Sequence, residues 1–244
     1  VTKHRPLTFN TMKIENANIL ITGGTLGIGY ATAKLLIEHG ANVAITGRDE
    51  RRTHKGAREL GAMPITADVA NPDDVKRTFE TFLTEYGRLD ALINNAGIGL
   101  SKKLENVTVE DFQQVYSVNV FGAAMMGKRA AEIFKKQNYG NIINIGSTAA
   151  TKGYEGGSVY ASSKFALRGM TQCWQAELRR YNVRVMLLNP SEVTTAFGPQ
   201  DREERESQPN KLRGREIARA IKGALELDDR GFIPELAVWA TNPF

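Results

Sequence analysis

The chain has 244 residues, of which 41% are hydrophobic, and a formal net charge of +5. A chain of this length can bury one substantial core, and it has no apolar run long enough to predict a membrane span. Its charges are interspersed, whereas nucleic-acid-binding proteins concentrate basic residues on one face or helix. We expect a single domain over residues 12–244, preceded by an extension over residues 1–11. We expect the protein to bind neither nucleic acid nor membrane.

Cysteine and histidine usage excludes several kinds of site. Cys173 is the only cysteine, which rules out an internal disulfide and a cysteine zinc cluster. We expect Cys173 to be a small buried residue, because it lies in a helical pattern. His4, His39 and His54 lack metal-ligand spacing, so no metal site is predicted. With no apolar secretory segment at the start, the sequence predicts a cytoplasmic protein.

Apolar runs alternate with amphipathic segments along the whole chain. Seven runs predict strands: NILITGG, NVAITG, MPITADV, DALINNAG, NIINIGS, VRVMLLNP and GFIPELAVW. The intervening helices are predicted at 28–39, 49–60, 72–87, 108–137, 159–181 and 214–227. Continuous apolar character favours strands that are buried on both faces of a parallel sheet. The alternation predicts a Rossmann-like, doubly wound α/β fold with a seven-stranded parallel sheet and helices on both faces.

A glycine-rich turn, TGGTLGIG, follows the first predicted strand and opens the first predicted helix. Glycine permits a tight turn and lets backbone N–H groups approach a pyrophosphate at a helix amino end. The position between strand and helix is what makes this motif informative. It predicts dinucleotide contacts from Gly23, Thr25, Leu26, Gly27, Ile28 and Gly29.

The end of the second predicted strand bears on the choice of cofactor. An acidic residue there would bind the ribose 2′-hydroxyl of NAD, but the chain has Gly47 followed by Arg48. Arg48 can pair with the 2′-phosphate of NADP, while Asp49 is expected to cap the next helix. We therefore expect NADP(H) to be preferred, with NAD(H) possible. The alternative is that Arg48 is an ordinary surface cation.

Two tyrosine–lysine pairs, Tyr30–Lys34 and Tyr160–Lys164, have the spacing of one helical turn. A nearby cation lowers the pKa of tyrosine from about 10 and makes the phenol a better partner in proton exchange. Ser147, at the end of the fifth predicted strand, could donate a hydrogen bond to a substrate oxygen. Because only the second pair has such a companion, we expect Tyr160 and Lys164 to take part in acid/base chemistry. Tyr30 is expected to pack on its helix and Lys34 to be exposed.

Six motifs in order make the chain resemble the short-chain dehydrogenase/reductase family over nearly all of Met12–Phe244. They are TGGTLGIG, ADV after the third strand, NNAG after the fourth, Asn119 in YSVNVFG, Ser147 in NIGS, and YASSK. The resemblance implies an oxidoreductase that interconverts a carbonyl and an alcohol by hydride transfer. It implies a catalytic set of Asn119, Ser147, Tyr160 and Lys164, with Tyr160 as the acid and base and Lys164 also binding the nicotinamide ribose.

The same resemblance places further cofactor contacts. Asp68 and Val69 are expected near the adenine, and Asn95, Ala96 and Gly97 along the adenosine side. Contacts flanking the nicotinamide are expected from Pro190, Val193 and Thr195. Two positions depart from the family pattern: Ser191 stands where glycine is usual, and Leu26 stands where NADP-using members carry a basic residue.

Several alternatives stay open at this point. The substrate could be a 3-oxoacyl-carrier protein, met by basic residues at Lys128, Arg129, Lys135, Lys136 and Arg168. A protein of another class, a non-catalytic NADP(H) sensor or scaffold, would keep the fold without turnover. The polar stretch at about 191–214 is either a substrate lid or a solvated insertion. By resemblance we expect a homodimer or homotetramer formed through the helices at 108–137 and 159–181.

Overall fold

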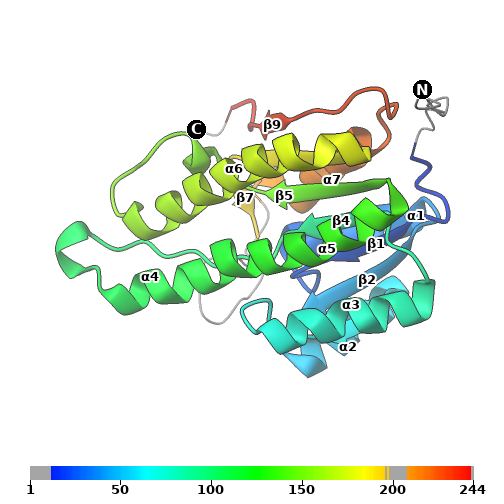
Figure 1. Ribbon diagram of the computed structural model, residues 1–244. Helices are drawn as coiled ribbons and strands as arrows, with labels where there is room; N and C mark the ends of the chain where they lie inside the picture. The colour runs from blue at the N-terminus through cyan, green and yellow to red at the C-terminus, as the bar shows by residue number, and fades with distance from the viewer. Residues whose placement is uncertain (1–11, 196, 198–207, 243–244) are drawn as a thin grey trace.

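The computed structural model of the protein describes residues 12–195, 197 and 208–242, and its centre is a parallel β-sheet (Figure 1). Seven strands pair in the order β3-β2-β1-β4-β5-β6-β9, and every pairing is parallel. The strands are β1 (Asn18–Ile21), β2 (Asn42–Gly47), β3 (Met63–Thr66), β4 (Ala91–Asn94), β5 (Gly140–Ile145), β6 (Val183–Pro190) and β9 (Glu235–Val238). The predicted seven-stranded parallel sheet is confirmed.

Helices cover both faces of this sheet (Figure 1). On one face lie α1 (Gly27–Glu38), α2 (Glu50–Leu60) and α7 (Gly214–Leu225); on the other lie α3 (Pro72–Tyr86), α5 (Ala123–Gln137) and α6 (Ser158–Leu178). Because side chains alternate along a strand, Ile19 and Ile21 enter the core beneath α1, whereas Leu20 enters the other core. Each strand therefore supplies two cores, which explains its continuous apolar sequence.

The amino ends of the helices differ in one respect that matters for binding. Asp49 caps α2 by accepting a hydrogen bond from the Arg52 N–H at 2.7 Å, as the sequence predicted. Asn71 caps α3, and Thr108 caps α4 (Val109–Tyr116). In contrast, no side chain caps α1, and its first turn has no acidic residue.

The structure corrects the sequence interpretation in two places. The segment 108–137 is not one regular helix, because a π-helical segment, η2 (Ser117–Gly122), separates α4 from α5. Such segments insert an extra residue per turn and occur often at functional sites. Cys173 is exposed rather than buried, because it lies on the outer side of α6.

The predicted lid at 191–214 is described only at its two ends. There β7 (Val193–Thr194) pairs in parallel with β8 (Leu212–Arg213). Residues 196 and 198–207 lie outside the described residues, as do the predicted extension 1–11 and the last two residues. The lid and the extension stay predictions. In the described ranges no helix is long and apolar enough to cross a membrane.

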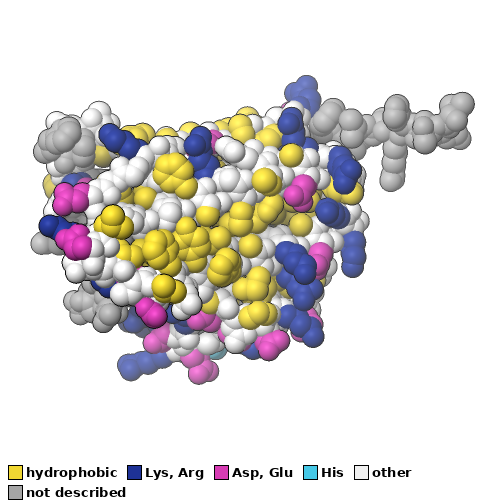
Figure 2. All heavy atoms as spheres, turned by 60° about the vertical axis from the view of Figure 1, so that its left-hand side comes forward, with side chains coloured by type: hydrophobic (Ala, Val, Ile, Leu, Met, Phe, Trp, Pro, Cys, Tyr) yellow, Lys and Arg dark blue, Asp and Glu magenta, His cyan; other side chains and the backbone are white. Residues whose placement is uncertain are grey.

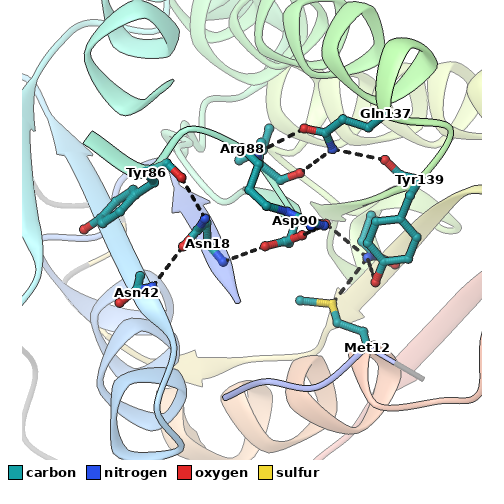
Figure 3. A network of polar contacts seen from close by, with 10 residues as sticks. Met12, Asn18, Asn42, Tyr86, Arg88, Asp90, Gln137 and Tyr139 are labelled. Carbon is teal, nitrogen blue, oxygen red and sulfur yellow. Dashed lines mark hydrogen bonds and ion pairs between the residues drawn. The ribbon is translucent and has the colours of Figure 1, made fainter. Parts of the chain in front are cut away.

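A polar network ties the strands together at the edge of the sheet where they begin (Figure 3). The Asp90 carboxylate accepts a hydrogen bond from the buried Asn18 N–H at 2.9 Å and pairs with Arg88. Asn18 in turn donates to the Tyr86 carbonyl at 3.1 Å and accepts from Asn42 at 2.9 Å. The network therefore links β1, β2 and the start of β4 at the edge where these strands begin.

Replacing Asp90 by alanine should lower the free energy of unfolding by about 1–3 kcal/mol, because it leaves the buried Asn18 N–H without its partner. Urea denaturation measures this loss. Asp228→Ala is the control, since Asp228 pairs with Arg230 at the surface and such pairs contribute about 0–1 kcal/mol. Equal losses in the two variants would contradict this role for Asp90.

Candidate active site

The residues singled out by sequence meet at the other edge of the sheet, where the parallel strands end. Strand order reverses between β1 and β4, because the chain winds outward from β1 through β2 to β3 and then returns to continue through β4. In doubly wound sheets the crevice at such a reversal is the usual ligand site. The glycine-rich turn follows β1 and the segment Asn95–Gly97 follows β4, so both border this crevice.

The glycine-rich turn forms a cradle made of backbone. Gly23 and Gly27 have φ angles of +64° and +58°, a region that disfavours residues with a side chain. A Cβ built on Gly29 would lie 2.5 Å from the Gly23 carbonyl oxygen. With α1 uncapped by any side chain, its amino end offers N–H groups and a positive dipole to an anion. These features fit the pyrophosphate of a dinucleotide.

Asn95, predicted along the adenosine side of a cofactor, supports the turn from the neighbouring strand. Its side-chain amide donates to the carbonyl oxygens of Thr22 and Gly23, both at 2.9 Å. The Thr22 hydroxyl accepts from the N–H groups of Asn95 and Ala96, both at 3.0 Å. These four bonds fix the glycine-rich turn to the end of β4.

The predicted adenine-side residues lie together beyond β2 and β3. Arg48 Nη1 and Asp68 Oδ2 are 3.9 Å apart, and both side chains are partly exposed. The other Asp68 carboxylate oxygen accepts from the Ala70 N–H at 2.9 Å. Val69 packs against the π-helical segment, since a Cβ on Gly122 would lie 2.8 Å from its side chain. The guanidinium of Arg48 therefore lies near Asp68, which follows β3, and remains partly exposed.

Asn119 lies in the π-helical segment and is buried. Its side-chain amide pairs with the backbone of Ile98, donating to the carbonyl and accepting from the N–H, both at 2.9 Å. It also donates to the Ser163 hydroxyl on α6 at 3.1 Å. Asn119 thereby connects the loop after β4 with the helix that carries Tyr160 and Lys164.

Lys164 is buried beside the crevice, and its ammonium group donates to the Ile145 carbonyl at the end of β5 at 2.8 Å. Burial lowers the pKa of Lys164 to about 8. The Nζ atom lies 5.8 Å from the centroid of the Tyr160 ring. A Cβ built on Gly97 would lie 3.8 Å from this Nζ, so Gly97 lies next to the Lys164 ammonium group.

The expected lowering of the Tyr160 pKa by Lys164 is wrong for the protein alone. Although part of the side chain reaches solvent, the packing around the Tyr160 hydroxyl raises its pKa to about 12. A hydrogen bond with the Ser147 side chain opposes this rise. Burial is the largest of these effects on the Tyr160 pKa. Tyr160 therefore carries its proton near neutral pH.

Ser147 stands just beyond the end of β5, where its oxygen accepts a hydrogen bond from the Ala149 N–H at 3.1 Å. Because the oxygen is held as an acceptor, the hydroxyl proton is left to donate. Ser147, Tyr160, Lys164 and Asn119 thus come from β5, α6 and η2, and the fold brings all four to one side of the crevice.

Residues predicted to flank a nicotinamide lie at the end of β6. Pro190 is its last residue, and Val193 lies in β7. A Cβ on Gly27 would lie 3.1 Å from Thr195, so this segment reaches the glycine-rich turn. Ser191 fits here without a left-handed backbone, and its hydroxyl accepts from the Ala240 N–H at 3.3 Å.

One neighbour of Tyr160, Phe197, was not singled out by sequence. The Phe197 ring packs on the Tyr160 ring at a centroid distance of 5.7 Å, and a Cβ on Gly99 would lie 2.7 Å from the Phe197 ring. The sequence around Phe197 gives no signal of these contacts, because they bring together segments that are distant in the chain. The first pair, in contrast, is as predicted: Lys34 is exposed, and the Tyr30 hydroxyl lies 3.4 Å from Glu59 on α2.

Comparisons with known proteins agree with this geometry. A family model described as short chain dehydrogenase matches residues 17–206. Secoisolariciresinol dehydrogenase of Forsythia intermedia is 36% identical over 197 residues, covering 79% of this chain and 71% of that protein.

Two solved structures share the whole fold. The 3-ketoacyl-(acyl-carrier-protein) reductase of Brucella melitensis complexed with NADH has a TM-score of 0.85 and 27% identity, covering 95% of this chain and 100% of that chain. The closed form of serine dehydrogenase complexed with NADP+ has a TM-score of 0.83 and 28% identity, covering 90% and 93%. The chain therefore belongs to the short-chain dehydrogenase/reductase family and is an oxidoreductase acting on alcohol and carbonyl groups.

Proposed function

We propose that the protein reduces a small-molecule carbonyl compound with NADPH, and oxidises the corresponding alcohol, with Tyr160 as the proton donor and acceptor. The observation that carries this proposal is the convergence of Tyr160, Ser147 and Lys164 at the end of β5, in a fold whose glycine-rich turn leaves the amino end of α1 without a side-chain cap. When bound, the reduced cofactor supplies the hydride for the carbonyl carbon. The chain itself has to bind the substrate oxygen and deliver a proton to it.

Ser147 and Tyr160 divide that task. The hydroxyl proton of Ser147 is available to a substrate oxygen, where it stabilises the negative charge that develops during the reaction. Tyr160 holds its proton near neutral pH because its pKa is raised to about 12. As negative charge builds on the substrate oxygen, the phenol proton moves to it.

Lys164 and Asn119 would restore that proton. Lys164 has a pKa near 8, so near neutral pH it is charged yet able to exchange a proton. Its charge stabilises the phenolate that Tyr160 leaves behind. Asn119 fixes the loop at Ile98 and the α6 residue Ser163, and by family resemblance it would hold the water that leads from Lys164 to solvent.

Tyr160→Phe should lower the rate of NADPH-dependent carbonyl reduction by about 10²–10⁴-fold, because it removes the hydroxyl group that delivers the proton to the substrate oxygen. A suitable panel contains an aromatic aldehyde, a vicinal diketone and an acetoacetyl thioester, followed by NADPH absorbance. Binding of NADPH, measured by fluorescence titration, should persist. Tyr30→Phe is the matched control from the other tyrosine–lysine pair and should keep full activity. A Tyr160→Phe enzyme with wild-type turnover would rule out the assignment.

The cofactor preference rests on Arg48. Proteins of this fold have been solved with NADH and with NADP+, so the choice in this chain depends on its own residues. Arg48 follows β2, and its one ion pair among the described residues is the 3.9 Å contact with Asp68; a 2′-phosphate would offer it a stronger, charge-assisted partner.

Arg48→Gln should weaken NADPH binding by about 10- to 100-fold, the effect of losing one charged hydrogen-bonding group. Binding of NADH should change little. Arg51→Gln, in the exposed first turn of α2, is the control and should leave both affinities unchanged. Fluorescence titration with each cofactor measures the two constants. Preference of the wild-type protein for NADH would contradict the proposal.

A second candidate substrate class is an acyl thioester on a carrier protein, favoured by the likeness to the Brucella melitensis reductase. The basic surface predicted for such a partner is partly engaged within the chain. Arg129 pairs with Glu132, Arg168 pairs with Glu235, and Lys135 lies over the Tyr181 ring. The thioester in the substrate panel distinguishes this candidate from a small ketone or aldehyde.

Oligomer formation would cover an apolar face of the molecule. Figure 2 shows hydrophobic side chains gathered in a band on the side where α4, α5 and α6 lie. Val109, Phe112, Phe121 and Phe165 are exposed large hydrophobic residues of these helices and of η2. An exposed apolar patch of this kind favours association, here with a second copy of the chain.

Light scattering should therefore report a dimer or tetramer of the 26.9 kDa chain. The double variant Val109→Glu, Phe112→Glu should shift the mass toward the monomer, because it introduces like charges into the self-complementary face. NADPH titration confirms that the variant is folded. A wild-type protein that is monomeric at micromolar concentration would contradict the oligomer proposal.

A further inference from the structure

A chain of side chains runs from α6 through β9 and β6 to the backbone of Ser147. We propose that Asn189, Glu235 and Arg168 are positioning residues that set the orientation of Ser147 relative to Tyr160. This inference rests on the proposed function, in which Ser147 donates to the substrate oxygen. None of the three residues touches the substrate in this account.

Ser147 lies beyond the last backbone pairing of its strand. β5 ends at Ile145, and the Gly146 N–H still donates to the Leu188 carbonyl of β6 at 2.8 Å. At Ser147 the acceptor is a side chain of β6 instead of its backbone, because the Ser147 N–H donates to the Asn189 amide oxygen at 3.1 Å. Asn189 therefore holds the backbone of Ser147 while the Ala149 N–H holds its hydroxyl oxygen.

Gly146 provides the space that this contact needs. A Cβ built on Gly146 would lie 2.1 Å from the Asn189 amide oxygen, which no real side chain could tolerate. Asn189 is only 1% exposed, and a buried amide requires partners for both its oxygen and its nitrogen. The contact between Asn189 of β6 and the segment after β5 therefore depends on a glycine at position 146.

Glu235 satisfies the other end of the Asn189 amide. On the paired strands β6 and β9, Asn189 is opposite Ala237 and Leu187 is opposite Glu235. Asn189 and Glu235 are therefore diagonal neighbours on one face of the sheet. The Asn189 nitrogen donates to Glu235 Oε1 at 2.8 Å.

Arg168 connects this pair to the helix of Tyr160. Its Nε atom donates to Glu235 Oε2 at 3.0 Å, so the two carboxylate oxygens of Glu235 have separate partners. Arg168 and Tyr160 are both on α6, eight residues apart. A continuous hydrogen-bonded path therefore joins the helix that carries the proposed proton donor to the strand end that carries Ser147.

The geometry makes a specific kinetic prediction. Without Asn189 the Ser147 backbone loses its anchor, and displacements of about 1 Å at a catalytic group can cost about 10²-fold in rate. Asn189→Leu should lower kcat by about 10- to 100-fold and leave the NADPH dissociation constant unchanged. Glu235→Gln, which retains an acceptor but loses its charge, should lower kcat by a smaller factor, about 3- to 10-fold.

A double-mutant cycle with Ser147→Ala separates positioning from general packing. If Asn189 acts through Ser147, adding Asn189→Leu to Ser147→Ala should cause no further loss of kcat. Asn144→Leu is the matched control: Asn144 is a buried asparagine of β5 whose amide bonds to Asn94 and Thr171 instead. Any loss that it causes should be the same in the wild-type and Ser147→Ala backgrounds.

Rates are measured with NADPH and the panel carbonyl that the wild-type protein reduces fastest. Wild-type kcat in Asn189→Leu, or losses from Asn189→Leu and Ser147→Ala that multiply, would overturn the inference. If Asn189→Leu does not fold, Glu235→Gln decides the matter, and wild-type kcat in that variant overturns it. A wild-type protein that reduces no carbonyl refutes the proposed function instead, whereas an active protein disabled by Ser147→Ala but not by Asn189→Leu refutes only the positioning relay.

Discussion

Parallel pairing of β1 with β4, of β4 with β5 and of β5 with β6 is the constraint on which the rest of the molecule depends. It makes all four strands end at one edge, so that segments distant in sequence meet there. The glycine-rich turn, the segment at Asn95, Ser147 and Pro190 are each the continuation of one of these strands. At the opposite edge, where the strands begin, Asp90 and Asn18 join β1 to the start of β4. The polar network that supports the sheet is therefore distant from the candidate active site.

Burial sets the electrostatics of the site. It lowers the pKa of Lys164 to about 8 and raises the pKa of Tyr160 to about 12, so the two pKa values move apart and Lys164 becomes the stronger acid of the two. The simple expectation that a neighbouring cation lowers the phenol pKa omitted this desolvation. A protonated phenol suits the proposed reduction, in which Tyr160 would give its proton to the substrate oxygen. Ser147 counteracts the rise through its hydrogen bond, which makes its orientation important for the chemistry.

Sequence reasoning predicted the fold closely because strand and helix patterns are local. Asp49 as a cap followed from its neighbours in the chain, and the choice of Tyr160 over Tyr30 as the reactive tyrosine stays a prediction from motif order. Sequence reasoning failed where tertiary contacts determine the local structure. The π-helical segment around Asn119 interrupts a helix whose composition shows no break. The support of Ser147 by Asn189 was likewise beyond reach, because it depends on strand register and on the absence of a side chain at Gly146.

Transfer of hydrogen from the cofactor to the substrate tests the central claim most directly. NADPH deuterated at C4 of the nicotinamide, on the side that the enzyme uses, is incubated with the protein and a panel carbonyl, and the product is analysed by mass spectrometry. The account predicts an alcohol that carries one deuterium on the former carbonyl carbon, with the hydroxyl proton drawn from solvent through Tyr160. An alcohol without deuterium when either side of C4 is labelled, or oxidation of NADPH with no alcohol formed, would contradict it.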